Sequence, residues 1–252
     1  MMLKVLLLII SLLTITFEKD YASTDGLSDL KERLEPYLLP DHHPIKHTLD
    51  RLLADPEVLN SEESLKKAEF DLSRSQRQVN HVKVAKHRKL KHYLLKTYTN
   101  DQLVGDESLA FVRRVTSAQS IEAALDRLGY HAYFKVPKKW IYLLPHATLS
   151  PTQRHCVLVV EDMNIFDDEI NAFLWKNARW VTQEKLFALY TLLSEEGLVG
   201  SIYLDNIPFS IDGRIAFIDT EHIHVWPVPY NKLTRHLPKD LRMYWKELTI
   251  ER

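Results

Sequence analysis

The sequence feature that most constrains the fold is a continuous apolar run at residues 156–160. Its five residues, CVLVV, do not alternate with polar ones, and such a run predicts a strand buried on both faces of a sheet. A polar connector follows at residues 161–164, and a stripe of Leu and Tyr at helical spacing predicts a helix over 182–196, ended by Gly197. Together these signals favour an α+β domain built around a central sheet.

The composition excludes several classes of protein. The chain has 252 residues, of which 45% are hydrophobic, with 33 Lys and Arg against 34 Asp and Glu. The balanced charge argues against a nucleic-acid binder that works by neutralising phosphates in bulk. A single cysteine, Cys156, excludes an intrachain disulfide framework and a cysteine-based zinc finger. The chain therefore has the composition of a protein with a real hydrophobic core and no expected nucleic-acid partner.

The N-terminus has the pattern of a targeting segment. A short basic start at residues 1–4 precedes an apolar run at residues 5–17, which is shorter than the roughly 20 residues that a membrane span needs. No small residue stands three positions before a cleavage point near Ala22. We therefore expect residues 1–23 to be a signal peptide or an N-terminal anchor that tethers the chain through residues 5–17. Either makes the protein secreted or extracytoplasmic; a buried N-terminal strand or helix is the alternative.

The rest of the chain divides into a helical extension over residues 24–75 and a domain over residues 76–252. In the extension, leucines at helical spacing are interrupted by four prolines, which predicts several short helices. In the domain, the patterns predict a helix over 117–128 ended by Gly129, and a hairpin with its turn at Asp212-Gly213. Further strands are expected near residues 82–84, 93–96, 133–136 and 140–144, and a last short helix over 239–248.

Three segments in a fixed order resemble the protein-kinase-like superfamily. They are Tyr93-Leu94-Leu95-Lys96, the stretch 197–207 that contains Asp205-Asn206-Ile207, and Gly213-Arg214-Ile215-Ala216-Phe217-Ile218-Asp219. The last segment is the most specific, and the resemblance covers about residues 80–225. It implies a two-lobed fold in which a lysine on an early strand and two oxygen donors late in the chain hold ATP and magnesium.

The resemblance assigns roles to individual residues. Lys96 is similar to the lysine that pairs with the nucleotide phosphates, and Asn206 and Asp219 are similar to the two magnesium ligands. Glu122 or Asp126 resembles the helix acid that pairs with that lysine. Glu161 and Met163 lie in a segment similar to the hinge that bonds adenine through its backbone.

The departures from the family pattern concern catalysis. Ser201 stands where the family has its general base, and a serine does not accept a proton near neutral pH without a base of its own. Asp205 is the residue that could substitute for that base. No glycine occurs between Gly26 and Gly105, so the glycine-rich phosphate cover is missing, and only 33 residues follow Asp219. We therefore expect a kinase-like fold with a truncated C-terminal lobe.

Three functional hypotheses follow from these residues. The first is an exported pseudokinase that acts as a binding module toward a protein partner, with a nucleotide site. The second is an atypical kinase that transfers phosphate from ATP to a small molecule, a glycan or a protein. The third is an α+β structural protein in which the hairpin is coincidental.

Overall fold

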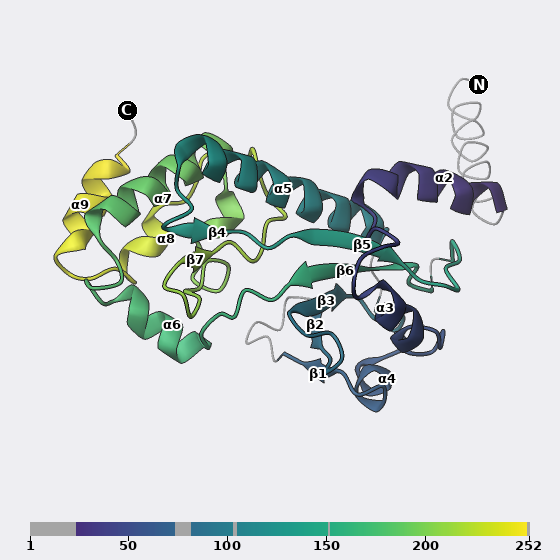
Figure 1. The fold of residues 1–252 in the computed structure, drawn as a ribbon. Helices are drawn as coiled ribbons and strands as arrows, with labels where there is room; N and C mark the ends of the chain where they lie inside the picture. The colour runs from purple at the N-terminus through teal and green to yellow at the C-terminus, as the bar shows by residue number, and fades with distance from the viewer. Residues whose placement is uncertain (1–23, 74–81, 103–104, 151, 251–252) are drawn as a thin grey trace, which may run out of the picture. The chain divides into compact units, whose positions relative to one another are not determined.

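The computed structural model describes residues 24–73, 82–102, 105–150 and 152–250 (Figure 1). The chain forms two compact units, and it passes between them more than once. The first unit comprises the described residues up to Lys89, then Lys96–Ser108 and Ile141–Val157. The second comprises Leu90–Leu95, Leu109–Trp140 and the chain from Leu158 onward. The predicted signal peptide or anchor lies outside the described residues, and the predicted domain boundary near residue 75 stays a prediction.

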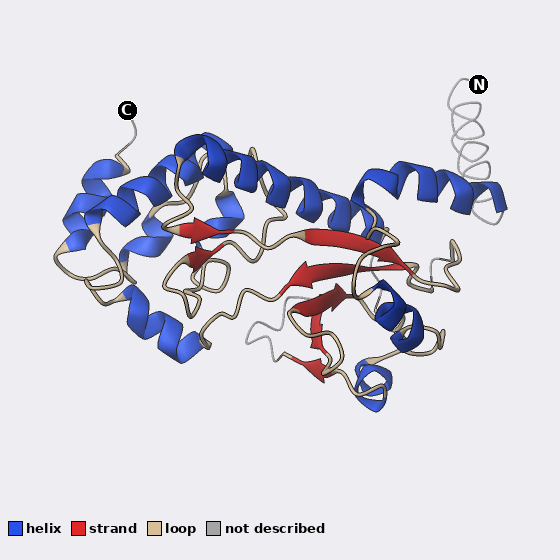
Figure 2. Cartoon of the chain, in the orientation of Figure 1, coloured by secondary structure: helices blue, strands red, loops and turns tan. Residues whose placement is uncertain are grey.

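The helices and strands make a mixed α+β fold (Figure 2). The α-helices are α2 (Thr24–Leu34), α3 (Lys46–Leu52), α4 (Glu62–Lys67), α5 (Glu107–Leu128), α6 (Asp168–Trp175), α7 (Gln183–Glu196), α8 (Asn231–Thr234) and α9 (Leu241–Leu248). The strands are β1 (Asp71–Leu72), β2 (Lys83–Lys86), β3 (Tyr93–Thr97), β4 (Phe134–Lys135), β5 (Lys139–Leu143), β6 (Cys156–Glu161) and β7 (Ile215–Ala216). Two 3₁₀ helices, η1 (Glu35–Tyr37) and η2 (Val199–Ile202), complete the elements. None of the described helices is both long enough and apolar enough to cross a membrane.

Five strands form one sheet in the order β1-β2-β3-β6-β5. The strand β6 lies between β3 and β5, and its residues 156–160 are all buried, which confirms the strand predicted from the apolar run. β1 and β2 pair antiparallel, with Asp71 opposite Lys86. The division between the two units falls within β3, β5 and β6.

In the first unit, the N-terminal segment joins the sheet. The helices α2, α3 and α4 are short, as the sequence predicts; prolines lie near the ends of α2 and α3, and α3 and α4 bury Leu49 and Leu65. After η1, Leu38 forms a parallel bridge with Ile141 of β5, and the Leu39 amide donates to the Ile141 carbonyl at 2.8 Å. The helical extension is therefore bonded to a strand of the sheet.

In the second unit, helices α5, α7 and α9 surround an apolar core that includes Trp175 and Trp245. Both indoles are fully buried, and each satisfies its N–H by donating to a backbone carbonyl, of Ile207 and Tyr230 respectively. Figure 1 shows α7, α8 and α9 side by side at one end of this unit. Burial of these side chains, together with the aliphatic residues of the core, stabilises the unit.

Helix α7 begins and ends close to where the sequence predicts, whereas helix α5 is longer than predicted. Thr182 caps α7 by accepting from the Lys185 amide, and Gly197 ends it in the left-handed conformation at φ 58°. Helix α5 begins at Glu107, ten residues before the predicted start at residue 117. Asp106 accepts from the Ser108 amide at 2.9 Å and from its hydroxyl at 2.6 Å, and an Asp in this place is the start signal that the leucine pattern missed.

The predicted hairpin forms its turn but not its full ladder. Gly213 has the positive φ, 83°, that the turn requires, and Phe209 and Ile215 form an antiparallel bridge. The returning strand β7 pairs instead in parallel with β4, where Phe134 lies opposite Ile215. Strands β4 and β5, predicted on either side of one turn, thus belong to different sheets.

The carboxylate of Asp212 holds this turn together. It accepts from the Ser210 hydroxyl, from Lys135 Nζ at 3.0 Å and from Arg214 Nη2 at 2.8 Å. Burial acts to raise the pKa of Asp212, but the hydrogen bonds from Arg214, Ser210 and Lys135 outweigh it and hold this pKa well below its ordinary value of 3.8. Because the folded-state pKa is lowered, the stabilisation is present above pH 4 and is lost as the pH falls through the folded value.

We therefore expect Asp212→Asn to lower the free energy of unfolding by about 0.5–1 kcal/mol at pH 7, since the group is partly exposed. The difference from the parent should shrink as the pH is lowered below 4, because the unfolded carboxylate then takes up a proton that the folded one still lacks, and it should vanish only below the folded-state pKa. Urea unfolding at a series of pH values measures it. A difference that does not change with pH would show that the charge of Asp212 has no role.

Candidate functional site

The candidate site lies in the second unit, where the segment after β7 meets η2 and the loop that follows η2. Asp219 comes three residues after the end of β7 and is partly buried. Ser201 of η2 donates its hydroxyl hydrogen to the Asp219 carbonyl at 3.3 Å, and it is 1% exposed. Ser201 therefore has a structural bond at the position where the kinase-like pattern has a base.

Two hydrogen bonds hold Asn206, one to the segment after β7 and one to η2. Its backbone carbonyl accepts from the Ile218 amide at 3.1 Å, one residue before Asp219. Its side-chain Nδ2 donates to the Gly200 carbonyl at 2.7 Å, next to Ser201. Because the amide nitrogen is used in this way, Oδ1 is the atom of Asn206 that could bind a cation. The structure thus brings three of the predicted residues, Ser201, Asn206 and Asp219, into one cluster.

The same cluster contains a buried lysine that the sequence interpretation missed. Lys139, the first residue of β5, is 4% exposed and donates to the Thr220 hydroxyl at 2.7 Å and to the Ile218 carbonyl at 3.4 Å. These two acceptors flank Asp219 in the chain. In the sequence, Lys139 belongs to a Pro-Lys-Lys turn signal, and nothing in that pattern distinguishes it from a solvated turn lysine. These two hydrogen bonds fix the Lys139 side chain beside the backbone of Asp219.

The residues that follow Asp219 are bonded to α5. Thr220 donates its hydroxyl to the Arg114 carbonyl at 2.8 Å, and Glu221 pairs with Arg114 Nη2 at 2.5 Å. Burial acts to raise the pKa of Glu221, but the charge and hydrogen bond of Arg114 outweigh it, so that this pKa is lowered. Both residues that directly follow Asp219 therefore have partners on α5.

The other predicted residues belong to other elements of the chain. Asp205 is exposed, next to Asn206. Glu122 and Asp126 are exposed on α5, and Asp126 Oδ1 accepts from His131 Nε2 at 2.8 Å. Lys96 lies in β3 in the first unit and is 8% exposed. The assigned roles of Lys96, Glu122 and Asp205 stay predictions.

The connector 161–164 uses most of its backbone within the second unit. The Asp162 amide donates to the His92 carbonyl at 2.8 Å, and the Asn164 carbonyl accepts from Ile211 at 3.0 Å. The Glu161 carboxylate accepts from the Lys138 amide at 3.0 Å. These bonds do not use the backbone groups of Met163, whose role stays a prediction. Binding of adenine here stays a prediction.

Comparisons with known proteins reveal a distant structural similarity. No protein-family model matches it, and no curated protein matches it. A search of solved structures finds Rv3197 from Mycobacterium tuberculosis in complex with erythromycin, with 16% identity and a TM-score of 0.32. The match covers 92% of this chain and 64% of the length of that one. The likeness is a distant one, and it carries no argument about the activity of this protein.

Proposed function

We propose that this chain is a degenerate kinase-like protein that binds a magnesium nucleotide through Asn206 and Asp219 and acts by contact with a protein partner. The observation that carries the proposal is the pair of bonds from Ser201 to the Asp219 carbonyl and from Ile218 to the Asn206 carbonyl. They hold a carboxylate and a side-chain amide on adjacent segments. Oxygen atoms of these types are the ligands that magnesium prefers.

The bonding of Ser201 supports binding rather than phosphate transfer. Its hydroxyl is buried and already donates to a carbonyl, so it has neither the charge nor the exposure that a base toward a substrate needs. The bonds of Thr220 and Glu221 to Arg114 attach the segment after Asp219 to α5. A segment bonded in this way suits a fixed binding surface.

We expect ATP with magnesium to raise the melting temperature of the chain. At about 100 times the dissociation constant, a ligand of the native state stabilises it by about 2.7 kcal/mol, or about 5–10 °C for a chain of this size. Asp219→Asn should abolish the rise, because it removes the charged oxygen donor with little change in volume. Thermal unfolding with ATP and magnesium, with ATP and EDTA, and with magnesium alone measures it.

The matched control is Asp212→Asn, seven residues earlier, whose carboxylate bonds within its own turn. It should keep the full nucleotide shift relative to its own melting temperature. No shift in the parent, or an equal shift in Asp219→Asn, would contradict the nucleotide site. Phosphate transfer from labelled ATP is the second measurement. If the parent transfers phosphate, Asp205→Asn does not and Ser201→Ala still does, the atypical-kinase hypothesis replaces that of a binding module.

A further inference from the structure

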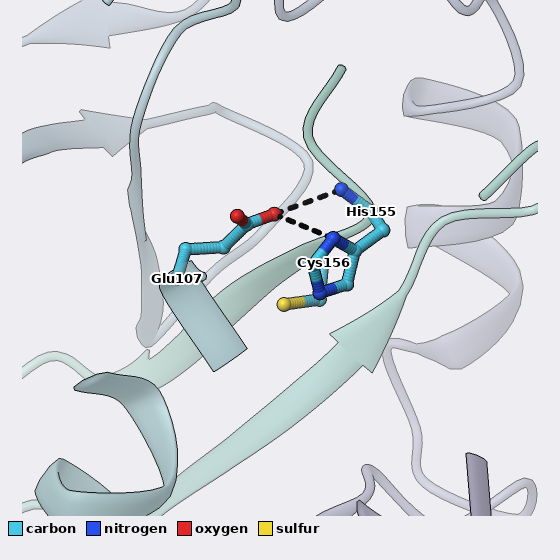
Figure 3. A group of neighbouring side chains, drawn as sticks. All are labelled: Glu107, His155 and Cys156. Atoms are coloured by element: carbon cyan, nitrogen blue, oxygen red, sulfur yellow. Dashed lines mark hydrogen bonds and ion pairs between the residues drawn. The ribbon is translucent and has the colours of Figure 1, made fainter. Parts of the chain in front are cut away.

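A cluster of three different metal-binding side chains lies in the first unit. Glu107 stands at the start of α5, and His155 and Cys156 stand at the start of β6 (Figure 3). One ligand atom of each residue lies within 4.8 Å of the other two, and all three residues are buried. The two segments are 48 residues apart in the chain, so only the fold brings them together.

The Glu107 carboxylate is oriented by its neighbours. Its Oε2 pairs with Arg154 Nη1 at 3.2 Å. Its Oε1 accepts from the His155 amide at 2.9 Å and lies 3.1 Å from His155 Nδ1. Ligands of a tetrahedral zinc ion, with bonds of about 2.0–2.3 Å, lie about 3.3–3.8 Å from one another. The 3.1 Å between Glu107 Oε1 and His155 Nδ1 is slightly below this range.

A second carboxylate lies on the other side of the imidazole. Asp106 Oδ1 is 3.6 Å from His155 Nε2, and Asp106 is itself held by the Ser108 amide and hydroxyl. In the part of the chain that the structure describes, Nε2 has no hydrogen-bond partner, although His155 is only 7% exposed. A carboxylate behind a histidine ring is the arrangement that orients metal-bound imidazoles.

The charges of the cluster also favour a cation. Two carboxylates, the buried Glu107 and the partly exposed Asp106, lie beside one guanidinium, Arg154, so the cluster has one carboxylate more than it has guanidinium groups. A divalent ion bound by the Cys156 thiolate would bring the group to neutrality, because a coordinated thiol loses its proton to solvent.

We propose that Glu107, His155 and Cys156 bind a divalent cation of the zinc class, with Asp106 orienting the imidazole of His155. The mixture of thiolate, imidazole and carboxylate selects zinc or cobalt over magnesium and calcium, which prefer oxygen alone. The ion would tie the first turn of α5 to the first residues of β6.

Cobalt titration of the full chain, after dialysis against EDTA, tests the proposal. Cobalt bound to a thiolate absorbs in the near ultraviolet, and the chain has one cysteine, so this band reports on Cys156 alone. We expect the band to saturate near one equivalent and to be abolished in Cys156→Ala, which keeps a small apolar side chain in a buried position. Zinc should displace the cobalt and raise the melting temperature of the parent.

The matched control is His131→Gln, which changes an exposed histidine beside a carboxylate in the second unit. It should keep the cobalt band unchanged, whereas His155→Gln should lower the affinity at least about tenfold. Circular dichroism checks that each variant is folded. Absence of the band in the parent would overturn the proposal without any variant, and so would a band that persists in Cys156→Ala.

Discussion

Replacing Glu107 with alanine should lower the free energy of unfolding by about 3–5 kcal/mol. The carboxylate and the Arg154 guanidinium that it pairs with are 3% and 2% exposed, and the carboxylate also accepts from the His155 amide. The substitution would leave the guanidinium buried without this carboxylate, and removing one member of a buried pair is far more costly than exchanging both. Urea unfolding in the presence of EDTA measures the effect independently of any bound ion.

The matched control is Glu195→Ala, which removes a carboxylate from a surface pair. Glu195 pairs with Arg127 at 2.7 Å, with side-chain exposures of 40% and 55%, and both ions stay hydrated when the pair is broken. We expect a change of about 0–1 kcal/mol. Equal effects for the two variants would mean that the pair of Glu107 is solvated in solution, and it would weaken the metal proposal as well.

Replacing Gly197 with alanine should lower the free energy of unfolding by about 2–5 kcal/mol. The residue ends α7 at φ 58°, which costs an alanine about 1–2 kcal/mol. A Cβ at this position would also lie 2.7 Å from Trp226 Cε2 and 2.7 Å from the Val225 amide nitrogen. The second contact is with backbone, which donates to the Gly197 carbonyl, so the clash adds about 1–3 kcal/mol.

Gly129→Ala separates the two contributions. Gly129 ends α5 at φ 70°, but no heavy atom lies within 4 Å of the position of its Cβ. This variant should therefore lose only the conformational part, about 1–2 kcal/mol. Denaturation midpoints at unchanged m-values give the loss of unfolding free energy for Gly197→Ala and for Gly129→Ala. If Gly197→Ala were no worse than Gly129→Ala, the chain at Val225 and Trp226 would not pack against the end of α7 in solution.

The local predictions succeeded because their signals act over a few residues. Thr182 caps α7 through an amide three residues away, and Gly213 permits a positive φ within its own turn. The burial of β6 follows from five consecutive apolar side chains. Helix α5 was predicted ten residues too short because its first turns lack the leucine pattern. The signal for its true start is a single side chain, that of Asp106, just before the helix.

The family resemblance predicted part of the candidate site and missed part of it. Ser201, Asn206 and Asp219 were chosen from the sequence, and the bonds of the second unit bring them together. Lys139 was not chosen, because a lysine in a turn signal is usually solvated. Its burial depends on Thr220 and Ile218, which lie about 80 residues later in the chain.

The sequence alone determined the α+β class, the end of α7 and the turn at Gly213, since backbone conformation and apolar periodicity are properties of short segments. Only the tertiary structure decided which polar groups are buried and which partners they have. Glu107 with His155, and Arg114 with Glu221, are each joined across 48 to 107 residues. Such pairs leave no local pattern, because the electrostatic and solvation energies that make them depend on burial, which exists only once the chain has folded.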